Sequence, residues 1–180
     1  MPMTEEINVI GFLCLEPDKG SPIEGEAQDT THKGEIQVVS YSVGVSNGRK
    51  ASPGEGDTEP SFQEMALTII QSKASPALML AVARPDHFKK ATLSIRKHGA
   101  SKTNADYLQI QMCDVYITTY THGGGEVGRG TESISLNFTS IDFYYAQQDA
   151  DGTLKTNVKR AWSICDNKDM PSALPYTPKK

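Results

Sequence analysis

Alternating apolar and polar residues constrain the fold of this 180-residue chain more than any other feature of its sequence. Apolar residues recur at every second position in three segments, 93–95, 108–112 and 134–138. A period of two places successive side chains on opposite faces of a β-strand, so each segment has one face for a core and one for solvent or a partner. The pattern therefore predicts a mainly β protein.

Eight or nine short strands, separated by turn residues, are predicted along the chain. Their expected ranges are 7–15, 36–43, 65–70, 91–96, 107–112, 115–120, 133–138, 141–145 and 161–164. Many short strands joined by turns are typical of a sandwich or a barrel. The length fits one domain, which we place at residues 1–168. Residues 169–180, which contain Pro and Lys, are predicted to form a mobile C-terminal tail.

One segment departs from the strand pattern and predicts a helix. Ser75 is expected at its N-cap, Pro76 at its first helical position, and Pro85 after its end. The residues between are Ala, Leu, Met and Val, so the helix is apolar on nearly every side. Such a helix needs to be covered, either by the barrel or by a neighbouring subunit.

Charge and hydropathy exclude two classes of partner. Eighteen basic and 22 acidic residues give a net charge of -4, which argues against binding to nucleic acid or to an acidic membrane surface. No segment approaches the roughly 18 consecutive apolar residues of a membrane-spanning helix, so membrane insertion is not expected. The N-terminus lacks the basic start of a Sec signal, so we expect synthesis in the cytoplasm and export, if any, by another route.

Metal, cofactor and catalytic motifs are sparse. Each of the four histidines stands apart from the others, and the three cysteines form no Cys-x-x-Cys pair. This spacing favours reduced thiols and no metal site, and no phosphate-binding loop motif occurs. The sequence therefore predicts a protein without cofactor.

Two short strings resemble those of esterases. Residues 44–48 match Gly-x-Ser-x-Gly around Ser46, and residues 122–125 match His-Gly-Gly-Gly. A nucleophile elbow needs a helix directly after the serine, whereas Ser46 is followed by loop residues. We predict that the protein is not an enzyme; the alternatives are a serine esterase using Ser46 and a monomeric binding module.

Four motifs, in order, resemble those of the haemolysin-coregulated protein (Hcp) family, the tube proteins of bacterial type VI secretion. They are Gly25–Lys33 followed by a strand, Lys73–Met79, Lys90–Lys97 continued by 107–115, and Ala161–Asn167. The match runs from about residue 7 to 167. Family members often have Ser where this chain has Ala27 and Gly where it has Ala161.

The resemblance implies a small β-barrel of two antiparallel sheets with one flanking α-helix. It further implies a structural subunit: six copies form a ring, and rings stack into a tube surrounded by a contractile sheath and capped by a trimeric spike protein. Such tubes are secreted into the extracellular space or a target cell in interbacterial competition and virulence, and they can carry or chaperone effectors.

The resemblance also assigns roles to individual residues. Ala27 and Gln28 are expected to face the lumen and its cargo. The loop 44–60 is expected to contact the adjacent ring through five charged residues, Arg49, Lys50, Glu55, Asp57 and Glu59. Stacking of rings should then depend on salt.

Overall fold

The structure is a computed structural model that describes residues 9–48, 59–96, 105–124, 130–148 and 154–175. These ranges contain eleven strands and one helix, which confirms the mainly β prediction. The strands are β1 (Gly11–Pro17), β2 (Ile36–Ser42), β3 (Val45–Asn47), β4 (Pro60–Phe62), β5 (Met65–Ile70), β6 (His87–Arg96), β7 (Asp106–His122), β8 (Thr131–Asn137), β9 (Ser140–Gln148), β10 (Leu154–Ser163) and β11 (Lys168–Met170).

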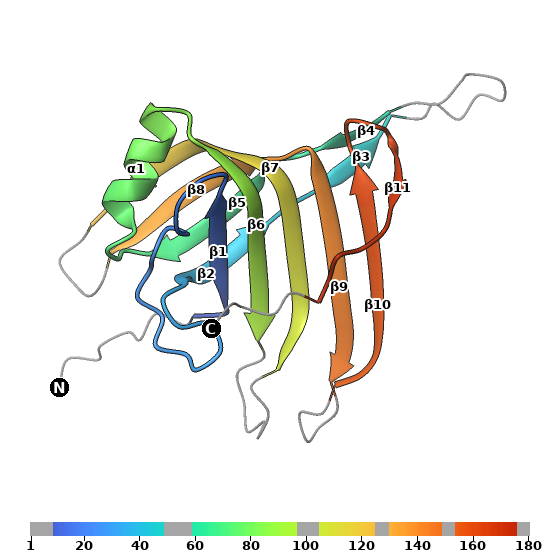
Figure 1. Ribbon diagram of the computed structural model, residues 1–180, viewed down its shortest axis with the longest axis horizontal. Coiled ribbons are helices and arrows are strands. Elements are labelled where there is room, and N and C mark those ends of the chain that lie inside the picture. Colours follow the sequence, from blue (N-terminus) through green and yellow to red (C-terminus); the bar gives the residue numbers. More distant parts are fainter. Residues whose placement is uncertain (1–8, 49–58, 97–104, 125–129, 149–153, 176–180) are drawn as a thin grey trace, which may run out of the picture.

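Nine strands form one antiparallel sheet that closes on itself. Their order is β11-β10-β9-β7-β6-β1-β2-β5-β8, and β7 also pairs with β8. This second pairing closes β7, β6, β1, β2, β5 and β8 into a barrel, while β9, β10 and β11 extend beyond it (Figure 1). The predicted barrel with one flanking helix is thus confirmed.

The long strand β7 serves both parts of the sheet. Its first half, up to Cys113, pairs with β9, and its second half, from Tyr116, pairs with β8. Asp114 lies between the halves with a positive φ of 51°, and the Thr139 hydroxyl donates a hydrogen bond to its carboxylate at 2.9 Å. The sequence pattern predicted two separate strands here, whereas β7 runs as one strand from Asp106 to His122.

The core of the barrel follows the alternation read from the sequence. Leu13, Leu93 and Ile110 are directly opposite one another on β1, β6 and β7, and all three are fully buried. Because cross-strand partners share one face of a sheet, this row fixes which face of each strand points inward.

The helix α1 (Ser75–Ala83) packs against β7 at one side of the barrel (Figure 1). Its N-cap residue is Ala74, so the prediction of Ser75 as the N-cap was wrong. The Ser75 hydroxyl instead donates to the carbonyl of Ser72 at 2.8 Å, which closes the turn before the helix. Leu78 and Ala81 are buried against the barrel, but Met79 and Leu80 are exposed.

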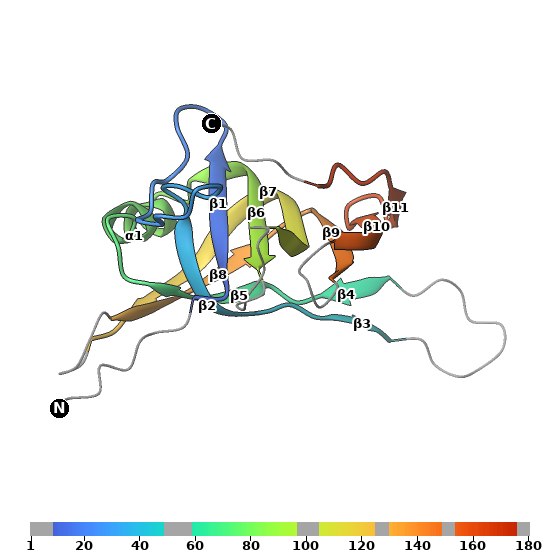
Figure 2. The same cartoon turned by 90° about the horizontal axis from the view of Figure 1, so that it is seen from below.

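A two-stranded ribbon made of β3 and β4 extends away from the barrel (Figure 2). Ser46 lies at the centre of β3, opposite Ser61 of β4. Because the strand continues to Asn47, no strand-to-helix turn raises this serine, and the geometry of a nucleophile elbow is not formed.

The C-terminal segment is ordered further than the sequence suggested. The expected tail begins inside β11, and residues 171–175 cross the outer face of β9 (Figure 1). Leu174 is buried against Tyr144 and Ala146, and Asp142 accepts hydrogen bonds from the Ser172 hydroxyl and the Ala173 amide, each at 2.7 Å. The expectation of mobility from residue 169 was therefore wrong for residues 169–175.

We predict that Leu174→Ala lowers the free energy of unfolding by about 2 kcal/mol, because it leaves a cavity over Tyr144 and Ala146. Ala173→Ser is the control, since this side chain is exposed. Urea denaturation measures both variants. Equal stability of the two would show that the segment is not anchored through Leu174.

Candidate functional site

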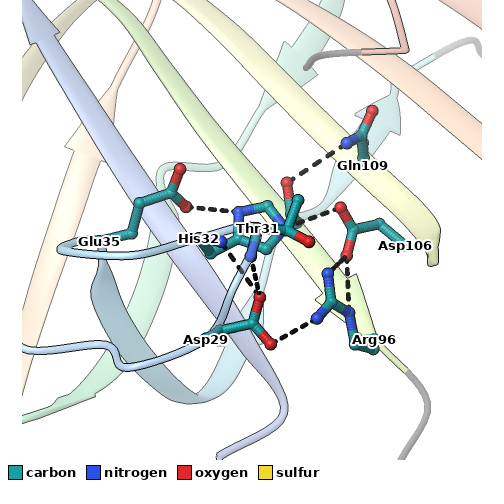
Figure 3. Close-up of polar contacts among 8 residues, drawn as sticks. Asp29, Thr31, His32, Glu35, Arg96, Asp106 and Gln109 are labelled. Carbon is teal, nitrogen blue, oxygen red and sulfur yellow. Dashed lines mark hydrogen bonds and ion pairs between the residues drawn. The ribbon is translucent and has the colours of Figure 1, made fainter. Parts of the chain in front are cut away.

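A cluster of five charged side chains ties the segment 25–35 to the barrel (Figure 3). The cluster, which we call the His32 network, consists of Asp29, His32 and Glu35 from that segment, Arg96 at the end of β6, and Asp106 at the start of β7. It therefore joins residues that are far apart in the sequence at one end of the barrel.

His32 is the centre of the network and has no exposed surface. Its Nδ1 donates a hydrogen bond to Glu35 Oε2 at 2.9 Å, and its Nε2 donates to Asp106 Oδ2 at 2.8 Å. Both ring nitrogens are thus occupied by carboxylates. The imidazole consequently has no free nitrogen with which to act as a base on an external substrate.

Arg96 bridges two carboxylates of the same network. Its Nη1 donates to Asp29 Oδ2 at 2.6 Å, and its Nη2 donates to Asp106 Oδ1 at 2.9 Å. The other oxygen of Asp29 accepts the backbone amides of Thr31 and His32 at 2.8 and 3.1 Å. Asp29 therefore holds the turn that carries His32 and fixes it to the barrel.

An aromatic ring covers the network from strand β1. Phe12 stacks on the His32 ring with centroids 4.8 Å apart, and the Arg96 guanidinium lies 5.8 Å from the centre of the Phe12 ring. Both contacts favour the cationic forms, since the face of an aromatic ring attracts positive charge.

The electrostatics of the network favour a charged histidine. Burial by itself lowers the pKa of His32, but the hydrogen bonds and charges of Asp106 and Glu35 outweigh it and raise the pKa from 6.5 to about 9. Burial raises the pKa of Asp29, but the amides of Thr31 and His32 together with Arg96 outweigh it, so the pKa of Asp29 is lowered. The network is therefore a set of ion pairs at neutral pH, and its role is to position the 25–35 segment.

The structure corrects one of the two expected cargo contacts. Ala27 is buried, and its backbone is held in place: its amide donates to the Glu35 carbonyl at 3.2 Å, and its carbonyl accepts from the Gly34 amide at 2.9 Å. A methyl group held inside the protein cannot touch cargo, so the prediction for Ala27 was wrong. The side chain of Gln28 is exposed, and its contact with cargo stays a prediction.

The expected stacking residues are only partly within the described chain. Glu59 is exposed just before β4, whereas Arg49, Lys50, Glu55 and Asp57 lie outside the described residues. Of the expected helix start, Ser75 is the first helical residue and Pro76 the second. Among the described positions, Glu59, Ser75 and Pro76 are not members of the His32 network.

The described residues offer neither a metal site nor a membrane helix. No group of three His, Cys, Asp or Glu side chains in these ranges could hold a metal ion. No helix among them is long and apolar enough to cross a membrane.

Sequence reasoning missed the His32 network because it treated each histidine as isolated. One signal was present: Asp29, His32 and Glu35 follow one another at intervals of three in a short loop segment. Asp106 and Arg96 are distant from this segment in the sequence, and the pairing of β6 with β7 places the two opposite each other.

Comparison with known proteins identifies the family. Residues 12–145 match the family model "Type VI secretion system effector, Hcp". The chain is also 34% identical over 149 residues to the protein Hcp1 of Pseudomonas aeruginosa, which covers 81% of this chain and 91% of that protein. The chain belongs to the Hcp family. It is thus a type VI secretion tube protein, and Hcp proteins are secreted by that system.

Solved structures agree with this assignment of the fold. A structure described as a type six secretion system protein has a TM-score of 0.79 at 21% identity and covers 91% of this chain and all of its own. A type VI secretion system effector from Yersinia pestis has a TM-score of 0.67 at 25% identity, covering 85% of this chain and 98% of its own. The Hcp barrel is therefore preserved despite low sequence identity.

The raised pKa of His32 predicts a specific dependence of stability on pH. Because the folded pKa is about 9 and the unfolded pKa about 6.5, the network's contribution is complete below pH 6.5 and is lost as pH rises to about 9. By linkage it amounts to about 3 kcal/mol. We expect His32→Gln to remove this decline from unfolding curves measured between pH 6 and 9.5.

His122→Gln is the matched control for that measurement, because His122 bonds Glu132 and leaves the His32 network intact. It should keep the wild-type decline. An unchanged decline in His32→Gln would contradict the assignment of the titration to His32.

The approach of Gly25 to the barrel gives a second prediction. A Cβ at Gly25 would lie 2.3 Å from the backbone oxygen of Glu35, so Gly25→Ala must displace the segment that carries His32. We expect a loss of about 2 kcal/mol in unfolding free energy. Gly48→Ala is the control, since its added Cβ meets no atom within 4 Å. If both variants matched the wild type in thermal melts, the 25–35 segment could move to accommodate the methyl group without loss of stability, which would contradict the prediction.

Proposed function

We propose that this protein is the structural subunit of the type VI secretion inner tube, with six copies forming a ring and rings stacking into a hollow tube. The match of residues 12–145 to the Hcp family carries this proposal. The described structure supports it, because its most developed polar cluster is buried and stabilises the barrel, with no accessible nucleophile or base.

The shape of the subunit is consistent with assembly. Strand β11 pairs only with Ala161–Ser163, so most of β10 lies at the edge of the sheet (Figure 1). The ribbon of β3 and β4 also extends beyond the barrel (Figure 2). A head-to-tail ring needs such unequal contact surfaces on the two sides of each subunit.

The assembled tube would be surrounded by a contractile sheath, capped by a trimeric spike and loaded with effectors in its lumen. Gln28, whose side chain is exposed, is the proposed lumen residue. It lies within the segment fixed by the His32 network, so cargo would meet a pre-positioned side chain and not a loose loop.

The proposal predicts separate effects on rings and stacks. Light scattering of the wild type across a range of concentrations should reach six times 19.6 kDa. Deletion of residues 46–57 should preserve a ring of six subunits and abolish tubes in electron micrographs, because the loop is proposed to contact only the adjacent ring. A wild type that stays at the mass of one chain would contradict the ring, and tubes that survive the deletion would contradict the role of the loop.

Replacement of residues 46–57 by a Gly/Ser segment of equal length is the control for connectivity. It restores the chain length without the charges, so tubes should remain absent. Increasing salt should likewise shorten wild-type tubes if the charged residues hold the rings together.

A further inference from the structure

The β3–β4 ribbon ends in an asparagine that is followed by glycine. The pair is Asn47, the last residue of β3, and Gly48. The other asparagines of the described residues, Asn137, Asn157 and Asn167, are followed by Phe, Val and Lys. The backbone nitrogen of the next residue can attack the side-chain amide carbon of an asparagine, and a side chain on that next residue hinders the approach. Because glycine has no side chain, the attack is favoured at Asn47.

The surroundings of Gly48 leave room for this attack. A Cβ built at Gly48 would meet no atom within 4 Å, and the side chain of Asn47 is exposed. Asn157 of β10 is also exposed, but the β-branched Val158 follows it. Asn157 is therefore a matched comparison within the same chain, since it has the exposure of Asn47 without the glycine.

The ribbon also gives Asn47 more conformational freedom than a strand of the barrel has. β3 and β4 form a separate two-stranded sheet that extends away from the barrel (Figure 2), and the pair Asn47–Pro60 lies at its end. Pro60 has no amide hydrogen to donate across this pair, and none of the three side chains of β3 is buried. A two-stranded ribbon is only marginally stable, so its end can open into the bent conformation that the attack requires.

We propose that Asn47 and Gly48 form a self-modification site that converts Asn47 into aspartate and isoaspartate, and that this conversion weakens the stacking of rings. The backbone nitrogen of Gly48 loses its proton to solvent and bonds to the side-chain amide carbon of Asn47. The amide nitrogen takes up a proton and leaves as ammonia, which closes a cyclic imide. Water then opens the imide at either carbonyl carbon, and the products are aspartate and isoaspartate.

Both products change the ribbon in ways that disfavour stacking. Each replaces a neutral amide by a negative carboxylate, and isoaspartate also lengthens the main chain by one carbon, which disturbs the register at the ribbon end. The chain already has a net charge of -4, so stacked rings of identical subunits repel more when every subunit gains a negative charge. This effect rests on the proposed stacking through residues 44–60, whereas the modification itself does not.

Timed incubation of the full-length protein in mildly alkaline buffer tests the site. Trypsin then releases Asn47 in the peptide 34–49 and Asn157 in the peptide 156–159. Mass spectrometry, together with methylation by an isoaspartate-specific methyltransferase, measures the conversion of each. We expect asparagine to be lost at position 47, with both products appearing, while Asn157 stays unchanged. Conversion that is no faster at position 47 than at Asn157 would overturn the site.

Gly48→Ala is the matched variant for this measurement. Its added methyl group meets no atom within 4 Å, so its melting curve should match the wild type. The same methyl group hinders the attack, so the loss of asparagine at position 47 should be much slower. Conversion in Gly48→Ala at the rate of the wild type would contradict the role of the glycine.

Electron micrographs of fresh and aged samples test the effect on stacking. The aged wild type should form shorter tubes than the fresh wild type, whereas Gly48→Ala should keep its own tube length on ageing. Asn47→Asp should form short tubes when fresh, and the neutral Asn47→Gln should match the fresh wild type. Tubes of equal length in Asn47→Asp and Asn47→Gln would overturn the effect on stacking.

The outcomes separate this inference from the proposed function. Tubes of constant length in a fully converted wild type would overturn the effect on stacking and leave the proposed function standing. A wild type that forms tubes under no condition would overturn the proposed function and the effect on stacking together. The peptide measurement in the same sample would still decide the modification site.

Discussion

The division of β7 between two partners is the constraint on which the rest of this structure depends. Up to Cys113 the strand pairs with β9, and beyond Asp114 it pairs with β8, which closes the barrel. A closed barrel has no edges, whereas the β9–β11 extension has an edge and exposes Phe143 and Tyr145 of β9. The same strand therefore gives the subunit a stable core and a surface that is not satisfied within one copy. In the proposed tube, such a surface would meet a neighbouring copy.

The His32 network stabilises the 25–35 segment at one end of the barrel. The 25–35 segment has few apolar residues, so it cannot be held to the barrel by hydrophobic packing. Ion pairs with Arg96 and Asp106 fix it to the barrel instead. A buried ion-pair network is costly unless every partner is present, and here both nitrogens of His32 are satisfied by carboxylates. Rigidity in this segment fixes the orientation of Gln28, which is where we place the contact with cargo. The barrel and the network are thus linked through Arg96 of β6 and Asp106 of β7.

Local patterning predicted the helix and most of the strands in their order, because alternation and turn residues are properties of neighbouring positions. The short strands β3, β4 and β11 were not predicted. Ser133–Phe138 and Ile141–Tyr145 were both recognised in this way, and they correspond to β8 and β9. Three features depended on distant residues and were not predicted. Asp114 in the middle of β7 bonds Thr139, Ala27 bonds the backbone of Glu35, and Leu174 packs on Tyr144. The His32 network was not predicted for the same reason, because the fold, and not spacing in the sequence, brings Asp106 next to His32.

Electron microscopy of the purified full-length protein tests the central claim most directly. If the open sheet extension exists to receive a neighbouring copy, averaged particles should be annular with six-fold symmetry, and concentrated samples should contain side views of stacked rings. Compact particles of single-subunit size at every concentration would contradict the account, since Phe143, Tyr145 and Val158 of β9 and β10 would then remain exposed to water in the functional protein.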